Sequence, residues 1–361
     1  MNDLLYYIAF SYCIGIGPMK FSLLKKRFRT AKKAYLASRR ELIEVIGVSL
    51  TEKFLDFRNR FDPVKKLEEL KRKEITVLTI DSKDYPESVR NISDPPICIY
   101  LKGFTLKVFA PFLTFAIVGT RQPTPYGVQV ARKFAYELAS AGFIIVSGMA
   151  YGIDTIAYQA CLEANGKTIA VLGCGVDVVY PSSNRLLYER IIKNGAVISE
   201  FPPGQFVLKG LFVARNRIIS AFSQGVMIVE GTKDSGSLIT ARYAAEQGKE
   251  VFAPPNPITS IMSAAPNILL KEGAKLVTKV EDIYEEFNLR ITPKKKEDIV
   301  KKLNNEEKKI FILLNKKPLL VDGLVAALKK PIGLVLNIVS LMEIDGIIEK
   351  NNDNKYQIKL H

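Results

Sequence analysis

Glycine-rich loops that also carry Arg, Lys, Asn or Ser recur along the middle of this 361-residue sequence. Glycines let backbone amides approach an anion closely, helix N-termini favour negative charge, and Arg and Lys complete the contacts to phosphate. The residues that could bind phosphate in this way are Gly119, Thr120, Arg121, Gly148, Arg215, Asn216, Arg217, Lys233, Ser235, Gly236 and Ser237. Asp154, Asp177 and Glu200 are weaker candidates, because each could instead cap a helix or hold a neighbouring Arg.

Short runs rich in Val and Ile position these loops. They span residues 115–119, 143–147, 168–172, 196–199, 226–229, 250–253 and 275–278, and helical patterns lie between them. Short apolar strands that alternate with helices predict an α/β fold with an extended Rossmann-like parallel sheet, covered on both faces. Ligands bind such sheets at the carboxyl ends of the strands. The loops are therefore expected at one edge of the sheet, where they form a phosphate-binding surface.

The composition excludes several common kinds of active site. The single His is the last residue, so no internal His can serve as a general base or a zinc ligand. The four Cys show no C-x-x-C spacing, which argues against a structural metal or a redox dithiol. The first loop is not G-x-G-x-x-G and no acidic residue ends the second strand, which disfavours a dinucleotide. We therefore expect no metal and no cofactor.

The formal net charge of +15 is unevenly distributed. Residues 1–90 carry +7, residues 115–287 carry +1 and residues 288–361 carry +6. Lys25, Lys26, Arg27 and Arg29 lie on an amphipathic helical pattern without acidic residues, and they predict a secondary basic surface for a polyanion. A merely solvated helix face is the alternative. Turns at residues 14–18 and 45–49 resemble helix-hairpin-helix turns, although each could be only a tight turn.

Shifts in composition predict the domain organisation. We expect a helical, helix-hairpin-helix or SAM-like domain at residues 1–90, the Rossmann-like domain at 91–287, a linker at 288–302 and a winged-helix-like domain at 303–361. The third helix of the last domain contains no Lys or Arg, which favours an interaction or weak DNA-binding role over sequence readout. No targeting pattern or membrane-spanning stretch is visible. A cytoplasmic protein without a membrane partner is expected.

The ordered motifs resemble the DNA-processing protein A (DprA, also called Smf) family. They are Gly119-Thr120-Arg121 with Tyr126-Gly127, Ser147-Gly148-x-Ala150-x-Gly152-Ile153-Asp154, the segment 170–181, Ser199-Glu200, the segment 215–219 and the segment 235–241. The resemblance implies a non-enzymatic protein that binds and protects incoming single-stranded DNA and loads the recombinase RecA onto it during natural transformation. It also implies a homodimer formed through the Rossmann-like domain.

This sequence departs from the common family pattern at Tyr151, Tyr158, Val213, Pro255 and Ala265. The departure at Tyr151 removes a positive charge beside the expected DNA surface. We therefore expect the departures to affect DNA affinity and partner recognition more than the fold.

Two enzymatic functions are alternatives to DNA binding. A phosphoribohydrolase of the lysine-decarboxylase-like class, acting on nucleoside monophosphates, would need a Glu in a Pro-Gly-Gly-x-Gly-Thr-x-x-Glu loop. The matching segment 235–241 lacks that Glu. A nuclease would need clustered carboxylates for metal ions, whereas Asp154, Asp177, Glu200 and Glu230 lie on separate loops. Both alternatives are weaker than DNA binding without catalysis.

Overall fold

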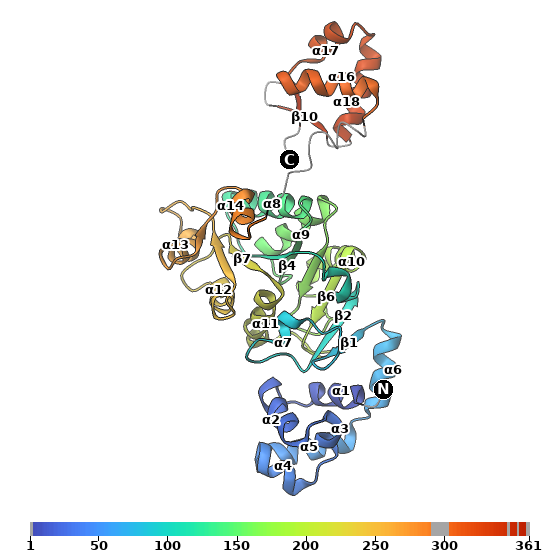
Figure 1. The fold of residues 1–361 in the computed structure, drawn as a ribbon, viewed down its shortest axis with the longest axis vertical. Helices are drawn as coiled ribbons and strands as arrows, with labels where there is room; N and C mark the ends of the chain where they lie inside the picture. The colour runs from blue at the N-terminus through green and yellow to red at the C-terminus, as the bar shows by residue number, and fades with distance from the viewer. Residues whose placement is uncertain (1–2, 290–302, 345–346, 352–353, 359–361) are drawn as a thin grey trace. The chain divides into compact units, whose positions relative to one another are not determined.

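The computed structural model describes residues 3–289, 303–344, 347–351 and 354–358. The chain divides into two compact units, unit 1 at residues 1–287 and unit 2 at residues 288–361 (Figure 1). Most of the predicted linker, residues 290–302, lies outside the described residues.

Unit 1 is built around one mixed sheet, with nine strands in the described part of the chain. The strands are β1 (Thr76–Thr79), β2 (Cys98–Gly103), β3 (Thr114–Val118), β4 (Ile144–Ser147), β5 (Thr168–Val171), β6 (Gly195–Ser199), β7 (Gly225–Ile228), β8 (Glu250–Ala253) and β9 (Lys275–Leu276). Their spatial order is β1-β2-β6-β5-β4-β3-β7-β8-β9. Strands β3 to β9 are all parallel, which confirms the predicted α/β class. The sequence did not predict β1 and β2, which extend the sheet in antiparallel pairing.

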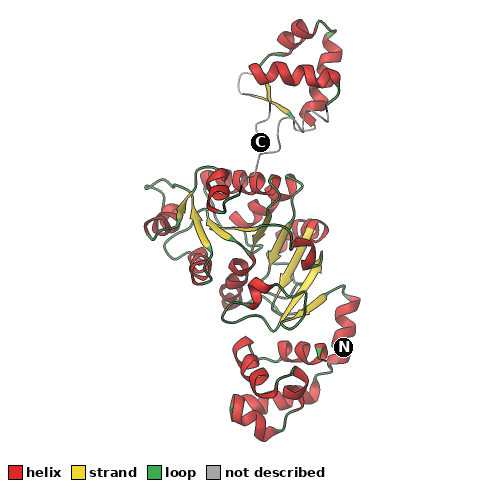
Figure 2. Ribbon diagram, in the orientation of Figure 1, coloured by secondary structure: helices red, strands yellow, loops and turns green. Residues whose placement is uncertain are grey.

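Helices cover both faces of the sheet (Figure 2). The helices of this part are α7 (Glu87–Arg90), α8 (Pro125–Ser140), α9 (Ile153–Glu163), α10 (Arg185–Asn194), α11 (Lys209–Phe222), α12 (Gly236–Glu246), α13 (Ala264–Lys271) and α14 (Val280–Glu286), with short 3-10 turns at Leu106–Phe109, Ser182–Asn184 and Ile261–Ser263. Side chains alternate across β5, as a buried parallel strand requires. Ile169 and Val171 join the core beneath α11 and α12, whereas Ala170 joins the core formed with α9 and α10.

The first 75 residues form a bundle of short helices. These are α1 (Leu4–Tyr12), α2 (Pro18–Phe28), α3 (Ala31–Leu36), α4 (Arg39–Ile46), α5 (Val48–Arg60) and α6 (Pro63–Arg72). Aromatic side chains fill its core, where the rings of Phe10 and Phe54 stack with centroids 5.2 Å apart. This core continues into the sheet through Cys98 and Tyr100 of β2. The separation of residues 1–90 from 91–287 stays a prediction, because contacts group both ranges into unit 1.

The described residues of unit 2 form three helices followed by a two-stranded antiparallel sheet. The elements are α16 (Asn305–Lys316), α17 (Val321–Leu328), α18 (Ile332–Ile344), β10 (Ile348–Lys350) and β11 (Tyr356–Ile358). The sequence predicts a buried stripe of Val335, Ile338, Val339 and Met342 in α18, of which Ile338 is partly buried and the other three are fully buried. The winged-helix likeness itself stays a prediction.

Among the described residues, no single helix is long and apolar enough to cross a membrane. The pair α17 and α18, taken through Glu343, meets the length and composition test together, but it is bent by 116°.

Candidate nucleic-acid interface

Arg121 lies exposed on the loop that connects β3 to α8. Its guanidinium carbon lies 5.5 Å from the ring centroid of Phe212, in the first turn of α11. The ring of Tyr180 lies 5.5 Å from that of Phe212, and Tyr180 is 38% exposed. We call Arg121, Phe212 and Tyr180 the arginine–aromatic row. It brings together two loops and the first turn of α11, which are distant in sequence, and it presents a cation and two rings on which nucleic-acid bases can stack.

The loops beneath this row are packed too closely to admit side chains at two glycines. Gly152 has a φ of +74°, and a Cβ there would lie 2.4 Å from the carbonyl oxygen of Thr120. A Cβ on Gly119 would lie 2.7 Å from Ile153. Glu230, which is buried, accepts hydrogen bonds from the backbone N–H and the hydroxyl of Thr124 at 2.9 and 2.6 Å. The Arg121 loop is therefore fixed from below by the loops after β4 and β7.

Arg215 is a buried cation rather than an exposed one. Its side chain leaves α11 and donates to the carbonyl oxygens of Gly148, at 2.7 Å, and of Val171. The carboxylate of Asp154 accepts from the backbone N–H groups of Gly148 and Ala150 at 3.0 and 3.2 Å. Burial raises the pKa of Asp154, and the positive charge of Arg215 opposes that rise. Arg215 and Asp154 thus tie the loop after β4 to the sheet.

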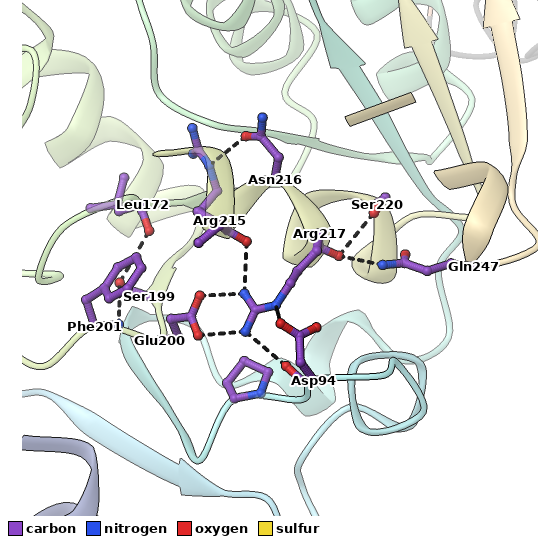
Figure 3. A network of polar contacts seen from close by, with 12 residues as sticks. Asp94, Leu172, Ser199, Glu200, Phe201, Arg215, Asn216, Arg217, Ser220 and Gln247 are labelled. Carbon is purple, nitrogen blue, oxygen red and sulfur yellow. Dashed lines mark hydrogen bonds and ion pairs between the residues drawn. The ribbon is translucent and has the colours of Figure 1, made fainter. Parts of the chain in front are cut away.

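The guanidinium of Arg217 is buried and forms its hydrogen bonds with other groups of the protein (Figure 3). Its two terminal nitrogens donate to the two carboxylate oxygens of Glu200, and its Nε donates to Asp94 at 2.8 Å. Backbone carbonyls of Asp94 and Ala214 accept from the same terminal nitrogens at 3.0 Å each. All five N–H donors are therefore engaged. No donor remains to reach a DNA phosphate in this arrangement.

The remaining predicted residues divide between surface and support. Lys233 is exposed on the loop before α12, and Thr120 is half-buried beside Arg121. Asn216 donates to the carbonyl oxygen of Gly236 at 3.2 Å. The hydroxyls of Ser235 and Ser237 lie 2.8 Å apart at the start of α12, where Ser235 caps the helix. Direct DNA contact by any of these residues stays a prediction.

Sequence reasoning missed the two rings and a nearby cation. Tyr180 was noted only as part of the family motif at 170–181, and Phe212 was not singled out, nor was Lys209, which is exposed at the first position of α11. Phe206, on the preceding loop, is 77% exposed. The signal in the sequence was the recurrence of Phe201, Phe206 and Phe212 around Lys209, which a prediction based on glycine-rich loops does not use.

The weaker acidic candidates all have internal partners. Asp177 accepts from Lys73 of the helical bundle at 2.8 Å and from the backbone N–H of Gly204 at 2.7 Å. Glu200 binds Arg217, and Asp154 binds the loop after β4 as described. In the part of the chain that the structure describes, no group of three or more His, Cys, Asp or Glu could hold a metal ion.

The departures from the family pattern lie in different environments. Tyr151 is 47% exposed, whereas Tyr158 is fully buried and its hydroxyl donates to the carbonyl oxygen of Ile169 at 3.1 Å. Val213 is partly exposed on α11, and Ala265 is buried. The carbonyl oxygen of Pro255 accepts from Tyr126. Tyr151 is thus an exposed departure on a loop of the carboxyl edge.

The fold and this edge define a Rossmann-like protein whose loops present a cation and aromatic rings at the carboxyl ends of parallel strands. The sequence pattern of the family described as DNA recombination-mediator protein A matches residues 76–288. The chain belongs to that family.

Two curated relatives illustrate the match. Protein Smf of Synechocystis is 41% identical over 255 residues, which are 70% of this chain and 64% of that protein. The DNA processing protein DprA of Streptococcus pneumoniae is 42% identical over 203 residues, which are 56% of this chain and 71% of that protein. The match to the Synechocystis protein thus covers slightly less than two thirds of its length.

Solved structures agree with the family. The structure of DprA from Streptococcus pneumoniae superposes with a TM-score of 0.70 at 33% identity, covering 79% of this chain and 98% of that one. DNA processing protein A from Helicobacter pylori, whose structure is described as showing a single-stranded DNA binding mode, gives a TM-score of 0.54 at 34% identity. That match covers 60% of this chain and 96% of the other.

Proposed function

We propose that this protein binds single-stranded DNA at the carboxyl edge of its sheet. The observation that carries the proposal is the arginine–aromatic row, in which the ring of Phe212 lies 5.5 Å from the guanidinium carbon of Arg121 and 5.5 Å from the ring of Tyr180. Base stacking on aromatic rings combined with cations along the backbone is the usual way to hold a single strand without sequence preference. The description of the Helicobacter pylori relative as a single-stranded DNA binder supports this choice.

Each residue of the edge has a distinct role in this proposal. Phe212 and Tyr180 stack on bases, and Arg121 contacts a phosphate or stacks on a base. Lys209 and Lys233, both exposed, attract the backbone. Arg215 and Arg217 are positioning residues, because their guanidiniums are buried and engaged by internal acceptors. The sequence predicted that Arg215 and Arg217 contact the DNA backbone directly. We propose instead that they act indirectly, by holding the loops of the edge in place.

The bound strand is proposed to serve recombination without being cleaved. The protein protects incoming DNA, loads RecA onto it during natural transformation, and acts in the cytoplasm as a homodimer formed through the Rossmann-like domain. The family description as a recombination mediator supports this part. RecA assembly on DNA coated with a single-strand-binding protein tests it. Acceleration by this protein is expected, and an unchanged rate of assembly contradicts it.

The DNA-binding proposal is tested by fluorescence anisotropy on a labelled single strand of mixed sequence across a salt series. Arg121→Ala and Phe212→Ala are each expected to weaken binding about tenfold, the order of one lost stacking interaction. Arg190→Ala, which removes an exposed cation on α10, is the matched control and should change little. Unchanged affinity in Arg121→Ala, or tighter wild-type binding to duplex than to the single strand, contradicts the proposal.

The phosphoribohydrolase alternative finds no support at the matching loop. Ser235 and Ser237 contact each other there, and the loop has no Glu at the position that reaction needs. Release of free base from a nucleoside monophosphate by the purified protein would restore that alternative.

A further inference from the structure

We propose that the helical bundle of unit 1 carries a second DNA site, which binds the phosphate backbone of double-stranded DNA. The site is a surface of α2, α3 and the turn between them, and we call it the basic face. Its residues are Lys20, Lys26, Arg27, Arg29, Lys32 and Lys33, and all six are exposed. The proposal concerns a ligand and a surface different from those of the single-strand site, and it does not depend on that site.

The cations of the basic face form no ion pair with a described carboxylate, although Glu41 interacts electrostatically with Arg27 and the carboxylate of Asp3 accepts from the backbone N–H of Lys32 at 2.8 Å. Within the described residues, none of the six has an acidic side chain within ion-pair distance, although neighbouring cations do. Lys25, which was predicted to belong to this surface, is only partly exposed and binds Asp81 instead. Glu41, whose pKa is lowered chiefly by hydrogen bonds from Ser38, is held by that residue at 2.7 and 2.9 Å. The six like charges therefore repel one another unless a polyanion covers them.

These charges are not needed for the packing of the bundle. Helix α2 buries Phe21 and Leu24 against the aromatic core, while Lys20, Lys26 and Arg27 lie on its exposed side. The helix has 11 residues, which at 1.5 Å per residue makes it about 16 Å long. That length is enough to reach more than one phosphate of a duplex.

A duplex fits the basic face better than a single strand does. Tight single-strand binding uses exposed rings that stack on bases, whereas the basic face has six exposed cations and one half-buried ring, Phe28, whose centroid lies 5.7 Å from the guanidinium carbon of Arg27. Phe21 and Tyr35 are buried, and Phe28 is half-buried. A duplex presents its phosphates at fixed spacing while its bases stay paired, so cations alone are sufficient for non-specific binding. The rings lie at the carboxyl edge and the clustered cations on the bundle, which points to two different DNA ligands.

An anionic membrane is the competing partner. Met19 and Leu23 of α2 are 63% and 46% exposed, and a basic helix with exposed apolar residues can also lie on lipid. Phe21 and Leu24 of the same helix are buried in the bundle, so α2 presents little apolar surface to lipid and we favour the duplex.

The test is anisotropy with the full chain, using a labelled duplex and a labelled single strand of equal length and mixed sequence across a salt series. The variant Lys26→Glu/Arg27→Glu/Lys33→Glu is expected to lose duplex affinity at least about tenfold and to retain single-strand affinity. Its slope of log affinity against log salt for the duplex should fall by about 2 to 3, since each phosphate contact contributes about 0.9. Arg121→Ala should show the reverse pattern. Failure of the single-strand proposal is thereby distinguishable from failure of this one.

The matched control reverses three exposed cations elsewhere in unit 1, Lys133, Arg190 and Lys193. An equal loss of duplex binding in this control, or no loss in the basic-face variant, overturns the proposal. A basic-face variant that loses binding to phosphatidylserine vesicles, when the wild type does not bind duplex, also overturns it. If the Glu variant fails to fold by circular dichroism, the neutral Lys26→Gln/Arg27→Gln/Lys33→Gln variant replaces it, with a proportionate loss of duplex affinity expected.

Discussion

Arg215 donates a hydrogen bond of 2.7 Å to the carbonyl oxygen of Gly148, and it lies so close that a side chain at Gly148 would collide with it. A Cβ at Gly148 would lie 2.4 Å from both terminal nitrogens of Arg215. The guanidinium is buried, so it cannot move aside into solvent. The guanidinium of Arg215, which comes from α11, thus explains why the motif has a glycine at residue 148.

Gly148→Ala is therefore expected to displace Arg215 from its carbonyl acceptors and to lower the free energy of unfolding by about 1–3 kcal/mol. Single-strand affinity should fall as well, because the loop after β4 supports Arg121. Urea unfolding followed by circular dichroism and anisotropy measure the two effects. Gly210→Ala, where a Cβ meets nothing within 4 Å, is the control. Wild-type stability in Gly148→Ala would show that Arg215 is not held as described.

Arg217→Met should destabilise the protein by about 3–5 kcal/mol, because it leaves the Glu200 carboxylate buried without its partner. The double variant Glu200→Leu/Arg217→Met should recover much of that loss, since no unpaired buried charge remains. Urea unfolding of the wild type, both single variants and the double variant measures the coupling. Additive effects of the two substitutions would contradict the ion pair. If Arg217→Met kept the stability of the wild type but lost DNA affinity, that result would indicate that Arg217 contacts DNA directly.

Asp177 should contribute to stability only above acid pH. Burial alone would raise its pKa, but hydrogen bonds from Lys73 and from the Gly204 N–H hold that pKa below the usual value of 3.8. Because its pKa is lower in the folded than in the unfolded state, the stabilisation is present above about pH 4 and is lost as the pH falls through the folded value. The difference in the free energy of unfolding between wild type and Asp177→Asn should therefore shrink as the pH falls from about 5 to about 3.

The control for this pH series is Asp234→Asn, at an exposed carboxylate without a described ion-pair partner. Urea unfolding at each pH gives the comparison. A difference between wild type and Asp177→Asn that stays constant over the series is inconsistent with the contacts to Lys73 and Gly204.

Tyr151→Arg is expected to tighten single-strand binding. Tyr151 is 47% exposed on the loop after β4, so the substitution adds a cation near Arg121 without disturbing the core. The salt slope should steepen by about 0.7, the value of one added phosphate contact on a single strand. Val64→Arg adds the same charge to an exposed site on α6 and should leave the single-strand slope unchanged. Equal slopes in Tyr151→Arg and the wild type would place Tyr151 away from the bound strand.

The sequence was sufficient to predict the parallel sheet but not its antiparallel extension. The strands β3 to β8 are continuous runs of Val, Ile and other apolar residues, as strands buried on both faces must be. By contrast, β1 reads Thr-Val-Leu-Thr and does not show that pattern. Strand β2 does begin with four buried apolar residues, at 98–101, but the sequence prediction did not include it. Their place in the sheet is set by pairing over a separation of many residues.

The site was predicted in its loops and less well in its side chains. Arg121 is exposed as predicted, but Arg215 and Arg217 are buried. Their burial could not be predicted, because a sequence shows where the charged residues are but not whether the fold buries them. Asp94 lies 123 residues from Arg217, so no local pattern could reveal that contact. Phe212 and Tyr180 meet only in the fold, for the same reason.

The pairing of β1 with β2 determines where this chain can be divided. Cutting at residue 90 would remove β1 and leave the backbone edge of β2 open to another strand, which promotes aggregation. The same cut would uncover Tyr100, now buried against the helical bundle, and would remove Lys73 from Asp177. A fragment that begins after residue 90 is thus expected to be poorly soluble, so studies of the DNA-binding sheet need the helices that precede it.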